Sequence, residues 1–368
     1  MNYRNLYNNG MSALLAICVL PAPLLALAEP IDPVIEEDQI VTLEDIRLES
    51  RKYGLQDAPA TKEGTFRLTT YNIENLFDTH DDPALTGKND DAGEAKPVHE
   101  LIATASAIRA VNADVLCIQE VESEQALLEY RDIYLADMGY DHVVSIDAGN
   151  DRGIENSVLS RFPIEQAKNW PNKPLGGVHP EKYGRSKNWY AGEPIAFRRS
   201  PLMIDLSIPS GDEPGAPSWT LTLFVMHHKS GFYNSYWREA EAKGTIEIIK
   251  SVLKEHPDRP IVVLGDFNAE NNDESVQLYL DEGFVDIFEN RKSHSEIMTH
   301  ESRRRIDLII ANPAALDRMN TDGAFVYGTA ARPDGVHYRD LETFEGYAAD
   351  HYPVSVDISR SKTTHTID

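Results

Sequence analysis

The sequence predicts an α/β fold built from short buried strands and the helices that lie between them. Eight apolar or β-branched runs are bounded by polar or turn residues, a pattern typical of strands. Three of these runs, "VLCI", "IVVLG" and "LIIA", are apolar throughout, whereas a strand with one solvent-facing side alternates apolar and polar residues. These three strands are therefore expected to be covered on both faces.

Each element is predicted by its own local pattern. The expected strands cover residues 66–73, 114–121, 156–162, 193–199, 219–228, 260–267, 305–312 and 352–359. Helices are expected over residues 99–112, 123–139, 235–257 and 272–283. Ser123 is a favourable N-cap for the second helix, and Pro257 ends the third. Because no linker separates these elements, we predict one domain over residues 65–359.

The two ends of the chain are predicted to lie outside this domain. Residues 1–28 contain an apolar run broken by Pro21 and Pro23 and end in a small-x-small cleavage pattern, which is typical of a secretory signal peptide. The alternative is a membrane anchor, which the two prolines and the short apolar run disfavour. We therefore expect a secreted or periplasmic protein with no stable membrane span. Residues 29–64 are expected to form a loosely packed N-terminal extension, and residues 360–368 a C-terminal tail.

The chain is strongly acidic, with 60 Asp and Glu residues, 35 Lys and Arg residues and a net charge of −25 at pH 7. Proteins that grip nucleic acid usually carry a basic face, and an acidic surface repels phosphodiester chains at long range. A solvated acidic surface, as in a salt-rich habitat, is the simpler explanation of this charge. Any binding of nucleic acid is therefore expected to depend on cations near the site, such as Arg161, Lys229 and residues 303–305.

Polar side chains gather where the apolar strands end. In "VVLGDFNAE", residues 262–270, Asp266 and Asn268 follow a buried strand and are two residues apart, so their side chains point the same way. Other strand ends carry Asn72, Glu74, Glu120, Asn156, His227, His228, Lys229, Asp307, Asp350 and His351. Each of these residues alone is more simply explained as a cap or as a solvent-facing group.

The joint pattern predicts a divalent-metal site at the strand ends. In layered α/β proteins ligands gather there, and a cluster of carboxylates must be offset by a cation or by protons. Oxygen ligands from Asp, Glu and amides suit Mg²⁺, Mn²⁺ or Ca²⁺. The sequence contains no CxxC or HExxH pattern, so a structural zinc site is not expected.

Seven short motifs follow one another between Thr65 and Ser359. They are "YNIEN", "IQEV", "NSVLSR", "HHKS", "GDFN", "RIDLI" and "ADHYPV". In this order they resemble the endonuclease/exonuclease/phosphatase superfamily, which includes DNase I-like nucleases, inositol-polyphosphate phosphatases and neutral sphingomyelinases. "YNIENLFD" and "HHKSG" resemble a branch of secreted bacterial members. The resemblance implies a four-layer α/β sandwich, in which two mixed β-sheets pack face to face and are flanked by helices.

The resemblance also implies catalytic roles for five residues. Asp266 would orient or deprotonate the attacking water, and Asn268 would hold a phosphate oxygen. His351 would contact the scissile phosphate and stabilise its growing charge, with its tautomer fixed by Asp307. His227 would be a second histidine that faces the phosphate.

A metal site is implied in the same way. Glu120 would hold Mg²⁺ or Mn²⁺, with Ca²⁺ as a further candidate. Asn72 would help it, and Glu74 is a weaker candidate for the same task. Asp350 would lie beside the metal or the attacking water.

These implications predict a secreted, metal-dependent and monomeric phosphoesterase that cleaves phosphodiester bonds in DNA or RNA. Asn156 and Lys229 would contact its substrate. The alternatives are a phosphatase or phospholipase acting on a phosphorylated small molecule or lipid head group, and a non-catalytic binding protein on the same scaffold. The loops at 163–192 and 321–346 are expected to decide the substrate. The Trp, Tyr, Lys and Arg residues of the first loop could stack bases or sugars, or could simply pack.

Overall fold

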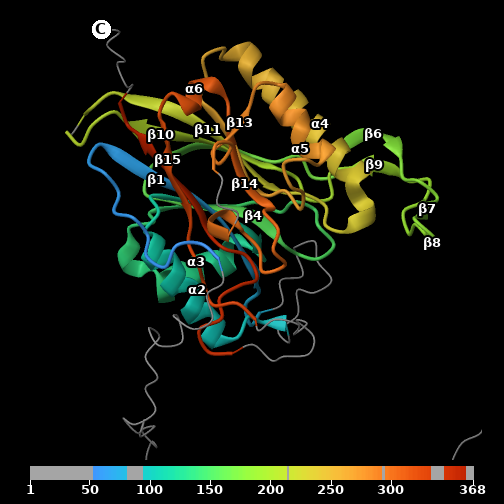
Figure 1. Ribbon diagram of the computed structural model, residues 1–368, viewed down its shortest axis with the longest axis horizontal. Helices are drawn as coiled ribbons and strands as arrows, with labels where there is room; N and C mark the ends of the chain where they lie inside the picture. Colours follow the sequence, from blue (N-terminus) through green and yellow to red (C-terminus); the bar gives the residue numbers. More distant parts are fainter. Residues whose placement is uncertain (1–52, 81–93, 214, 292–294, 333–343, 362–368) are drawn as a thin grey trace, which may run out of the picture. The chain divides into compact units, whose positions relative to one another are not determined.

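The described residues form two six-stranded mixed β-sheets (Figure 1). The computed structural model describes residues 53–80, 94–213, 215–291, 295–332 and 344–361. The strand order in the first sheet is β15 (Met319–Val326), β16 (Val354–Ser359), β1 (Thr65–Leu76), β2 (Val115–Val121), β4 (Glu155–Ser160) and β3 (His142–Ser145). The order in the second is β13 (Val285–Asp286), β14 (Asp307–Ala311), β12 (Ile261–Asp266), β11 (Ser218–His227), β10 (Leu202–Pro209) and β5 (Ile164–Lys168).

Each of these sheets contains a central parallel pair. β1 is parallel to β2, and β11 is parallel to β12, while their outer neighbours run antiparallel. Two small sheets lie outside the sandwich. In them β6 (Pro174–Val178) pairs with β9 (Pro194–Ala196), and β7 (Lys182–Tyr183) pairs with β8 (Ser186–Lys187).

Helices cover the outer faces of the two sheets. The α-helices are α2 (Val98–Val111), α3 (Glu124–Tyr134), α4 (Ser235–Glu255), α5 (Glu274–Asp281) and α6 (Pro313–Leu316). Short 3-10 turns are η3 (Ala136–Met138), η4 (Phe232–Asn234) and η5 (Ser295–Ile297). Figure 1 shows α2 and α3 on one side of the sheets and α4 and α5 on the other.

The four layers follow from the alternation of side chains along each strand. Cys117 of β2 lies in the core between the two sheets, while its neighbours Leu116 and Ile118 pack in the cluster that α2 and α3 cover. In the second sheet Leu264 faces the core between the sheets, and Val263 packs beneath α4 and α5. The runs that are apolar throughout are therefore buried on both faces, and the predicted four-layer sandwich is confirmed.

The predicted elements agree with the observed ones, with two kinds of difference. The strand predicted at 193–199 is wrong in extent, because its paired residues, Pro194–Ala196, belong to a small outer sheet. The prediction also missed eight strands in the described part of the chain, namely β3, β5, β10, β13 and β15 of the two large sheets and β6, β7 and β8 of the small ones. The loop expected at 163–192 therefore contains β5 to β8, and the one expected at 321–346 begins inside β15. β15 lacks an apolar run, because it lies at a sheet edge and its first half is polar. Ser123 caps α3 as predicted, since its side chain accepts the Ala126 N–H at 3.0 Å.

Part of the N-terminal extension is attached to the sandwich. The Leu55 N–H donates to the Val326 carbonyl at 2.8 Å, and the Leu55 carbonyl accepts from Gly328 N at 2.9 Å, unlike the loose packing expected. The predicted signal peptide at 1–28, residues 29–52 and most of the predicted tail lie outside the described residues. No helix in the described ranges is long and apolar enough to cross a bilayer.

Candidate active site at the strand ends

The second sheet places three predicted catalytic residues side by side. In the strand pairing, His227 of β11 lies opposite Asp266 of β12, and Asp266 lies opposite Asp307 of β14. Residues paired in this way project their side chains from the same face of a sheet. The backbone is closely packed here: Gly265 has a φ of 136°, and a Cβ on it would come within 2.1 Å of the Met226 carbonyl oxygen. Strand register therefore builds this part of the cluster.

The first sheet brings further residues to the same edge through irregular backbone. Register shifts interrupt the β1–β2 pairing after Asn72 and the β2–β4 pairing after Gln119. Glu74 and Glu120 lie at these shifts and have positive φ angles of 51° and 67°. Such backbone costs on the order of 1–3 kcal/mol per residue and is concentrated at functional sites. Asn72 joins the two sheets, because its Nδ2 donates to Asp266 Oδ2 at 3.2 Å.

His351 and Asp307 form a buried acid–imidazole pair. His351 Nδ1 lies 2.8 Å from Asp307 Oδ2 and 3.0 Å from Oδ1. Nε2 is left facing two carboxylates, Asp350 Oδ1 at 3.7 Å and Asp266 Oδ2 at 3.9 Å. Burial opposes a charge on this imidazole, but the carboxylates of Asp307 and Asp350 outweigh burial and raise the pKa of His351 well above its usual value. His351 is therefore a cation at neutral pH.

Asp266 is a buried carboxylate that accepts hydrogen bonds from Asn268 at both oxygens. The Asn268 backbone N–H donates to Oδ1 at 2.8 Å, and Asn268 Nδ2 donates to Oδ2 at 2.9 Å. Burial raises the pKa of Asp266 to about 6, against these bonds and the charge of His351. Asn268 Nδ2 also donates to the His228 carbonyl at 3.1 Å. Both amide hydrogens thus have protein acceptors, and a phosphate oxygen would have to displace one of them.

Two arginines enclose Glu120 and His227. Arg152 donates to both oxygens of Glu120 at 3.1 Å, and Arg199 contacts His227 Nε2. The same Nε2 lies 3.7 Å from Glu120 Oε1 and 3.4 Å from Asp266 Oδ2. Burial, reinforced by the charges of the two arginines, lowers the pKa of His227 well below its usual value. His227 is therefore a neutral imidazole at which carboxylates from both sheets meet.

His300 lies against the chain segment that carries Asp350 and His351. A backbone bridge joins His300 to His351, and the two rings meet edge to face with centroids 4.5 Å apart. His300 Nδ1 accepts the Ser302 backbone N–H at 2.9 Å, which leaves Nε2 to donate to Asp350 Oδ2 at 3.3 Å. Burial raises the pKa of Asp350, but the charge of His351 and the hydrogen bond from His300 outweigh it and lower that pKa.

Glu74 is bound by protein groups on several sides. Its carboxylate accepts from Arg332 at 2.9 Å and from the Tyr347 hydroxyl at 2.6 Å. It also accepts the Asp350 backbone N–H at 3.0 Å. Glu74 therefore holds the Asp350 segment against the end of β1, and any role toward a metal would compete with these bonds.

The donor set at the strand ends fits a hard divalent cation. Two overlapping groups of side chains are close enough to share an ion: Asp266, Asp307 and His351, and His300, Asp350 and His351. A protonated His351 has no free lone pair for a metal, so the carboxylates of these groups are the candidate ligands. Glu120 belongs to neither group, and its carboxylate is paired with Arg152. Glu120 and Asp266 nevertheless approach the same imidazole nitrogen, and Asn72 is bonded to Asp266. Carboxylate and amide oxygens of this kind are the ligands that Mg²⁺ and Mn²⁺ prefer.

The two predicted substrate-binding residues flank this cluster. Asn156 donates to the Ser200 carbonyl at 3.0 Å, and its buried Oδ1 has no hydrogen-bond partner in the described part of the chain. The Lys229 backbone N–H donates to Glu241 Oε2 at 2.9 Å, and the ammonium group lies 5.9 Å from the centroid of the Trp237 ring. Burial lowers the pKa of Lys229 to about 8. The Asn156 side-chain carbonyl oxygen is thus unpaired within the described residues but buried, and the Lys229 ammonium group also donates to the Ser230 carbonyl at 3.3 Å.

Two cations expected to grip nucleic acid are engaged elsewhere. Arg161 directly follows β4, at the opposite end of that strand from Asn156. Its guanidinium donates to Asp114 Oδ1 at 3.0 Å. Arg305 forms an ion pair with buried Asp286 at 2.6 Å. The expectation is therefore wrong for Arg161 and Arg305, because folding uses their charges to neutralise carboxylates.

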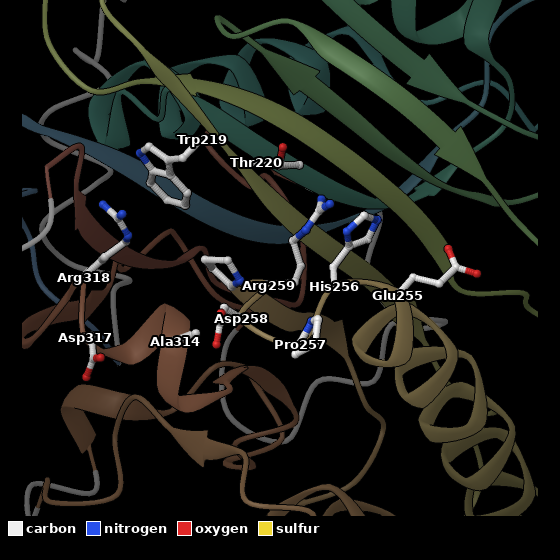
Figure 2. Close-up of a pocket in the computed structure, with 11 residues that line it drawn as sticks. Trp219, Thr220, Glu255, His256, Pro257, Asp258, Arg259, Ala314, Asp317 and Arg318 are labelled. Carbon is white, nitrogen blue, oxygen red and sulfur yellow. The ribbon is translucent and has the colours of Figure 1, made fainter.

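A cavity of about 680 Å³ lies at the opposite ends of the same strands (Figure 2). It is lined by Trp219 of β11, Arg259 before β12 and Arg318 after α6. Trp219 and His227 stand near opposite ends of β11, roughly 26 Å apart at about 3.3 Å per residue. This cavity is therefore separate from the candidate active site.

Sequence reasoning missed Arg152, Arg199 and His300. Arg199 ends the apolar run at 193–199, so the strand-end criterion that found the other residues would have found it. Arg152 and His300 lie in loops outside the named strands and helices. No local pattern marks a loop residue that reaches a site through the tertiary fold.

Comparison with known proteins places this fold and cluster in a family. Residues 69–323, more than half of the chain, match the Endonuclease/Exonuclease/phosphatase family, and the protein belongs to that family. Family members are phosphoester hydrolases, nucleases and phosphatases among them. None of the curated proteins compared with it matches the sequence.

Several solved structures are similar to the chain. The human Nocturnin catalytic domain with bound sulfate anion has 16% identity and a TM-score of 0.50, over 82% of this chain and 96% of that one. Truncated Caenorhabditis elegans TDP2 has 15% identity and a TM-score of 0.50, over 80% and 97%. Bacteroides thetaiotaomicron mannosyl-6-phosphatase Bt3783 has 16% identity and a TM-score of 0.47, over 79% and 98%. The first two support the fold assignment.

Proposed function

We propose that the protein is an exported, divalent-metal-dependent phosphodiesterase that cleaves DNA or RNA. The observation that carries the proposal is the buried base Asp266 between a neutral imidazole, His227, and a cationic one, His351. This combination supplies two things that phosphoester hydrolysis uses, a proton acceptor and a positive charge. The attacking water must lose a proton while the phosphoryl oxygens are stabilised by preorganised positive charge.

Five residues of the cluster have roles in this reaction. Asp266 takes the proton of the attacking water. His351, held by Asp307, presents Nε2 to the phosphoryl oxygens and stabilises their charge. Glu120 and Asn72 would hold Mg²⁺ or Mn²⁺, which neutralises charge on the phosphoryl group and acidifies water when bound. No covalent intermediate with the protein is required.

A phosphatase or phospholipase acting on a phosphorylated small molecule or lipid head group is the second candidate. The net charge of −25 favours it, because an acidic surface repels a long polyanion more than a small substrate. The motifs "YNIENLFD" and "HHKSG", which resemble those of secreted bacterial members, favour the nuclease. Nucleic acid is therefore the first substrate to test.

A panel of phosphoesters separates these candidates. The protein without residues 1–28 is incubated with Mg²⁺, Mn²⁺ or Ca²⁺ and with single- and double-stranded DNA, RNA, a sugar phosphate and a lipid head-group diester. A variant with Asp266→Asn and Asp307→Asn controls for contaminating hydrolases. Cleavage of DNA or RNA by the wild type alone supports the proposal. Turnover confined to small substrates selects the second candidate, and no turnover at all favours a non-catalytic binding protein.

Export rests on residues 1–28 and is tested independently of catalysis. N-terminal sequencing of the protein recovered from the periplasm or medium of producing cells should start at Glu29. Recovery of the chain with residues 1–28 intact, inside the cell, would contradict export.

A further inference from the structure

Solvent-exposed aromatic rings and exposed cations lie together on the segment of the β7–β8 hairpin and on the η4 turn. Trp189 is 90% exposed, Phe232 88% and Tyr233 57%. Residues 182–189, "KYGRSKNW", contain three cations and no acid, although the whole chain has a net charge of −25. Lys182, Arg185 and Lys187 are exposed, and within the described residues they have no ion pair. We refer to residues 182–189 with 232–233 as the hairpin surface.

The base of the hairpin surface is firmly anchored to the beginning of α4. Asn188 is fully buried, and its Nδ2 donates to the Tyr236 hydroxyl at 3.2 Å. His179 Nδ1 lies 2.9 Å from the same hydroxyl. Tyr233 lies so close to Gly184 that a Cβ on Gly184 would come within 2.8 Å of its ring. The backbone next to Trp189 and the Tyr233 ring are therefore packed, which lowers the conformational entropy that a ligand must remove when it binds there.

The hairpin surface is next to the candidate active site. β11 ends at His227 and the chain reaches Phe232 five residues later, so their Cα atoms are at most about 18 Å apart. On the other side, the Arg198 guanidinium lies 5.2 Å from the Tyr190 ring centroid, and the following residue, Arg199, contacts His227. Figure 1 shows β7 and β8 projecting beside β9 and the nearby end of α4.

We propose that the hairpin surface binds single-stranded nucleic acid a few nucleotides from the bond that is cleaved. Aromatic rings that stack on bases, set among cations that contact phosphates, are what such strands recognise. The tip of the hairpin is Gly184–Arg185, and a charged tip does not suit insertion into a lipid bilayer. This inference rests on the proposed function and explains how so acidic a protein retains a polyanion.

The test combines two variants with substrates of different length. Trp189→Ala removes a stacking ring, and Lys182→Gln with Lys187→Gln removes two charges. The matched controls change similar residues away from the surface, namely Ile133→Ala and Lys62→Gln with Lys254→Gln. Each protein is assayed on a dinucleotide and on a single-stranded 12-mer. The dinucleotide has a single phosphodiester, whereas the 12-mer is long enough to span the upper limit of about 18 Å between His227 and Phe232.

The expected result is a rise of about tenfold in KM for the 12-mer with Trp189→Ala, the scale of one base–aromatic stack, with kcat unchanged. KM for the dinucleotide should change less than twofold. The two-lysine variant should lower the slope of log KM against log salt by about 1 to 1.5, at about 0.7 per lost phosphate contact. The control variants should behave as wild type.

Three outcomes overturn the inference. One is cleavage of both substrates with no KM difference between the hairpin and control variants, which leaves the proposed function intact. Another is binding of anionic phosphatidylserine vesicles that Trp189→Ala abolishes while the KM for the 12-mer is unchanged, which makes the surface a membrane contact. The third is the absence of hydrolysis of either substrate by the wild type, which removes the proposed function and this inference together.

Discussion

Asp307 Oδ2 lies 2.8 Å from His351 Nδ1, and both side chains are buried. Asp307 begins β14, whereas His351 follows a loop and leads into β16 in the other sheet. The bond therefore connects the two sheets and turns Nε2 of His351 toward Asp266. A carboxylate in this position both fixes the tautomer and stabilises the imidazolium.

The first prediction concerns this pair. Asp307→Asn keeps the shape of the side chain but removes the charge that holds His351 protonated, so kcat should fall about a hundredfold or more. Because the pKa of His351 is raised by Asp307, its loss should also move the alkaline limb of the pH–kcat profile to lower pH. Steady-state kinetics from pH 5 to 10 measure both effects. A profile identical to that of the wild type would show that His351 does not act as a cation.

The second prediction concerns Asp266. Its pKa is raised to about 6 by burial, and a base must be deprotonated, so activity should be lost as the pH falls through about 6. Asp266→Asn should lower kcat about a hundredfold or more. Its residual activity should lack this acid limb. An acid limb that persists unchanged in the variant would assign the base elsewhere.

The third prediction concerns the metal. Excess chelator should abolish hydrolysis, and Mg²⁺ or Mn²⁺ should restore it. Glu120→Gln should weaken Mn²⁺ binding, measured by calorimetry. Because Glu120 is buried and paired with Arg152, thermal unfolding is measured on the same variant to separate a lost site from a lost fold. Glu165→Gln, on the exposed face of β5, is the matched control. Full activity in excess chelator would rule out metal dependence.

The fourth prediction makes His300 a positioning residue. His300 donates to Asp350 and packs against the His351 ring, so His300→Gln should lower kcat by about tenfold with little change in KM. Loss of the hydrogen bond should raise the pKa of Asp350, but the acid limb near pH 6 belongs to Asp266 and should not move. His256→Gln, at the distant cavity, should leave kcat unchanged. A rise in KM with unchanged kcat would contradict the positioning role.

The fifth prediction concerns stability and pH. Burial raises the pKa of Glu155 to about 8, so between its unfolded pKa of about 4.5 and pH 8 the folded state holds a proton that the unfolded state releases. The free energy of unfolding should therefore fall by a few kcal/mol, on the order of 3, as the pH rises through this range. Glu155→Gln should reduce that fall while keeping the bond from the Ala148 N–H. Urea unfolding at pH 5 and pH 8 measures the difference, and an equal loss in both proteins would contradict the assignment.

Local patterns in the sequence determined the class of fold and most of the candidate site. Strands buried on both faces need apolar residues at every position, so "VLCI" and "IVVLG" could be recognised as such strands. Polar residues that end these strands must lie at the edge of the sheet. For this reason the sequence alone could identify Asp266, Asp307 and His351 as candidate site residues, and the fold places them in contact. The order of the motifs, through the family resemblance, supplied the roles proposed for these residues.

Tertiary structure alone decided which partner each of these groups has. The Arg152 guanidinium contacts Glu120 and the His300 ring contacts Asp350, and both residues lie in loops. Loop sequences have no periodic pattern of apolar residues from which such contacts could be predicted. The charges on His227 and His351 also depend on the fold. Both imidazoles are buried, but the nearest charges are arginines around one and carboxylates around the other, so their pKa values shift in opposite directions. Sequence specifies which groups a chain carries, whereas electrostatic energy depends on the distances between them.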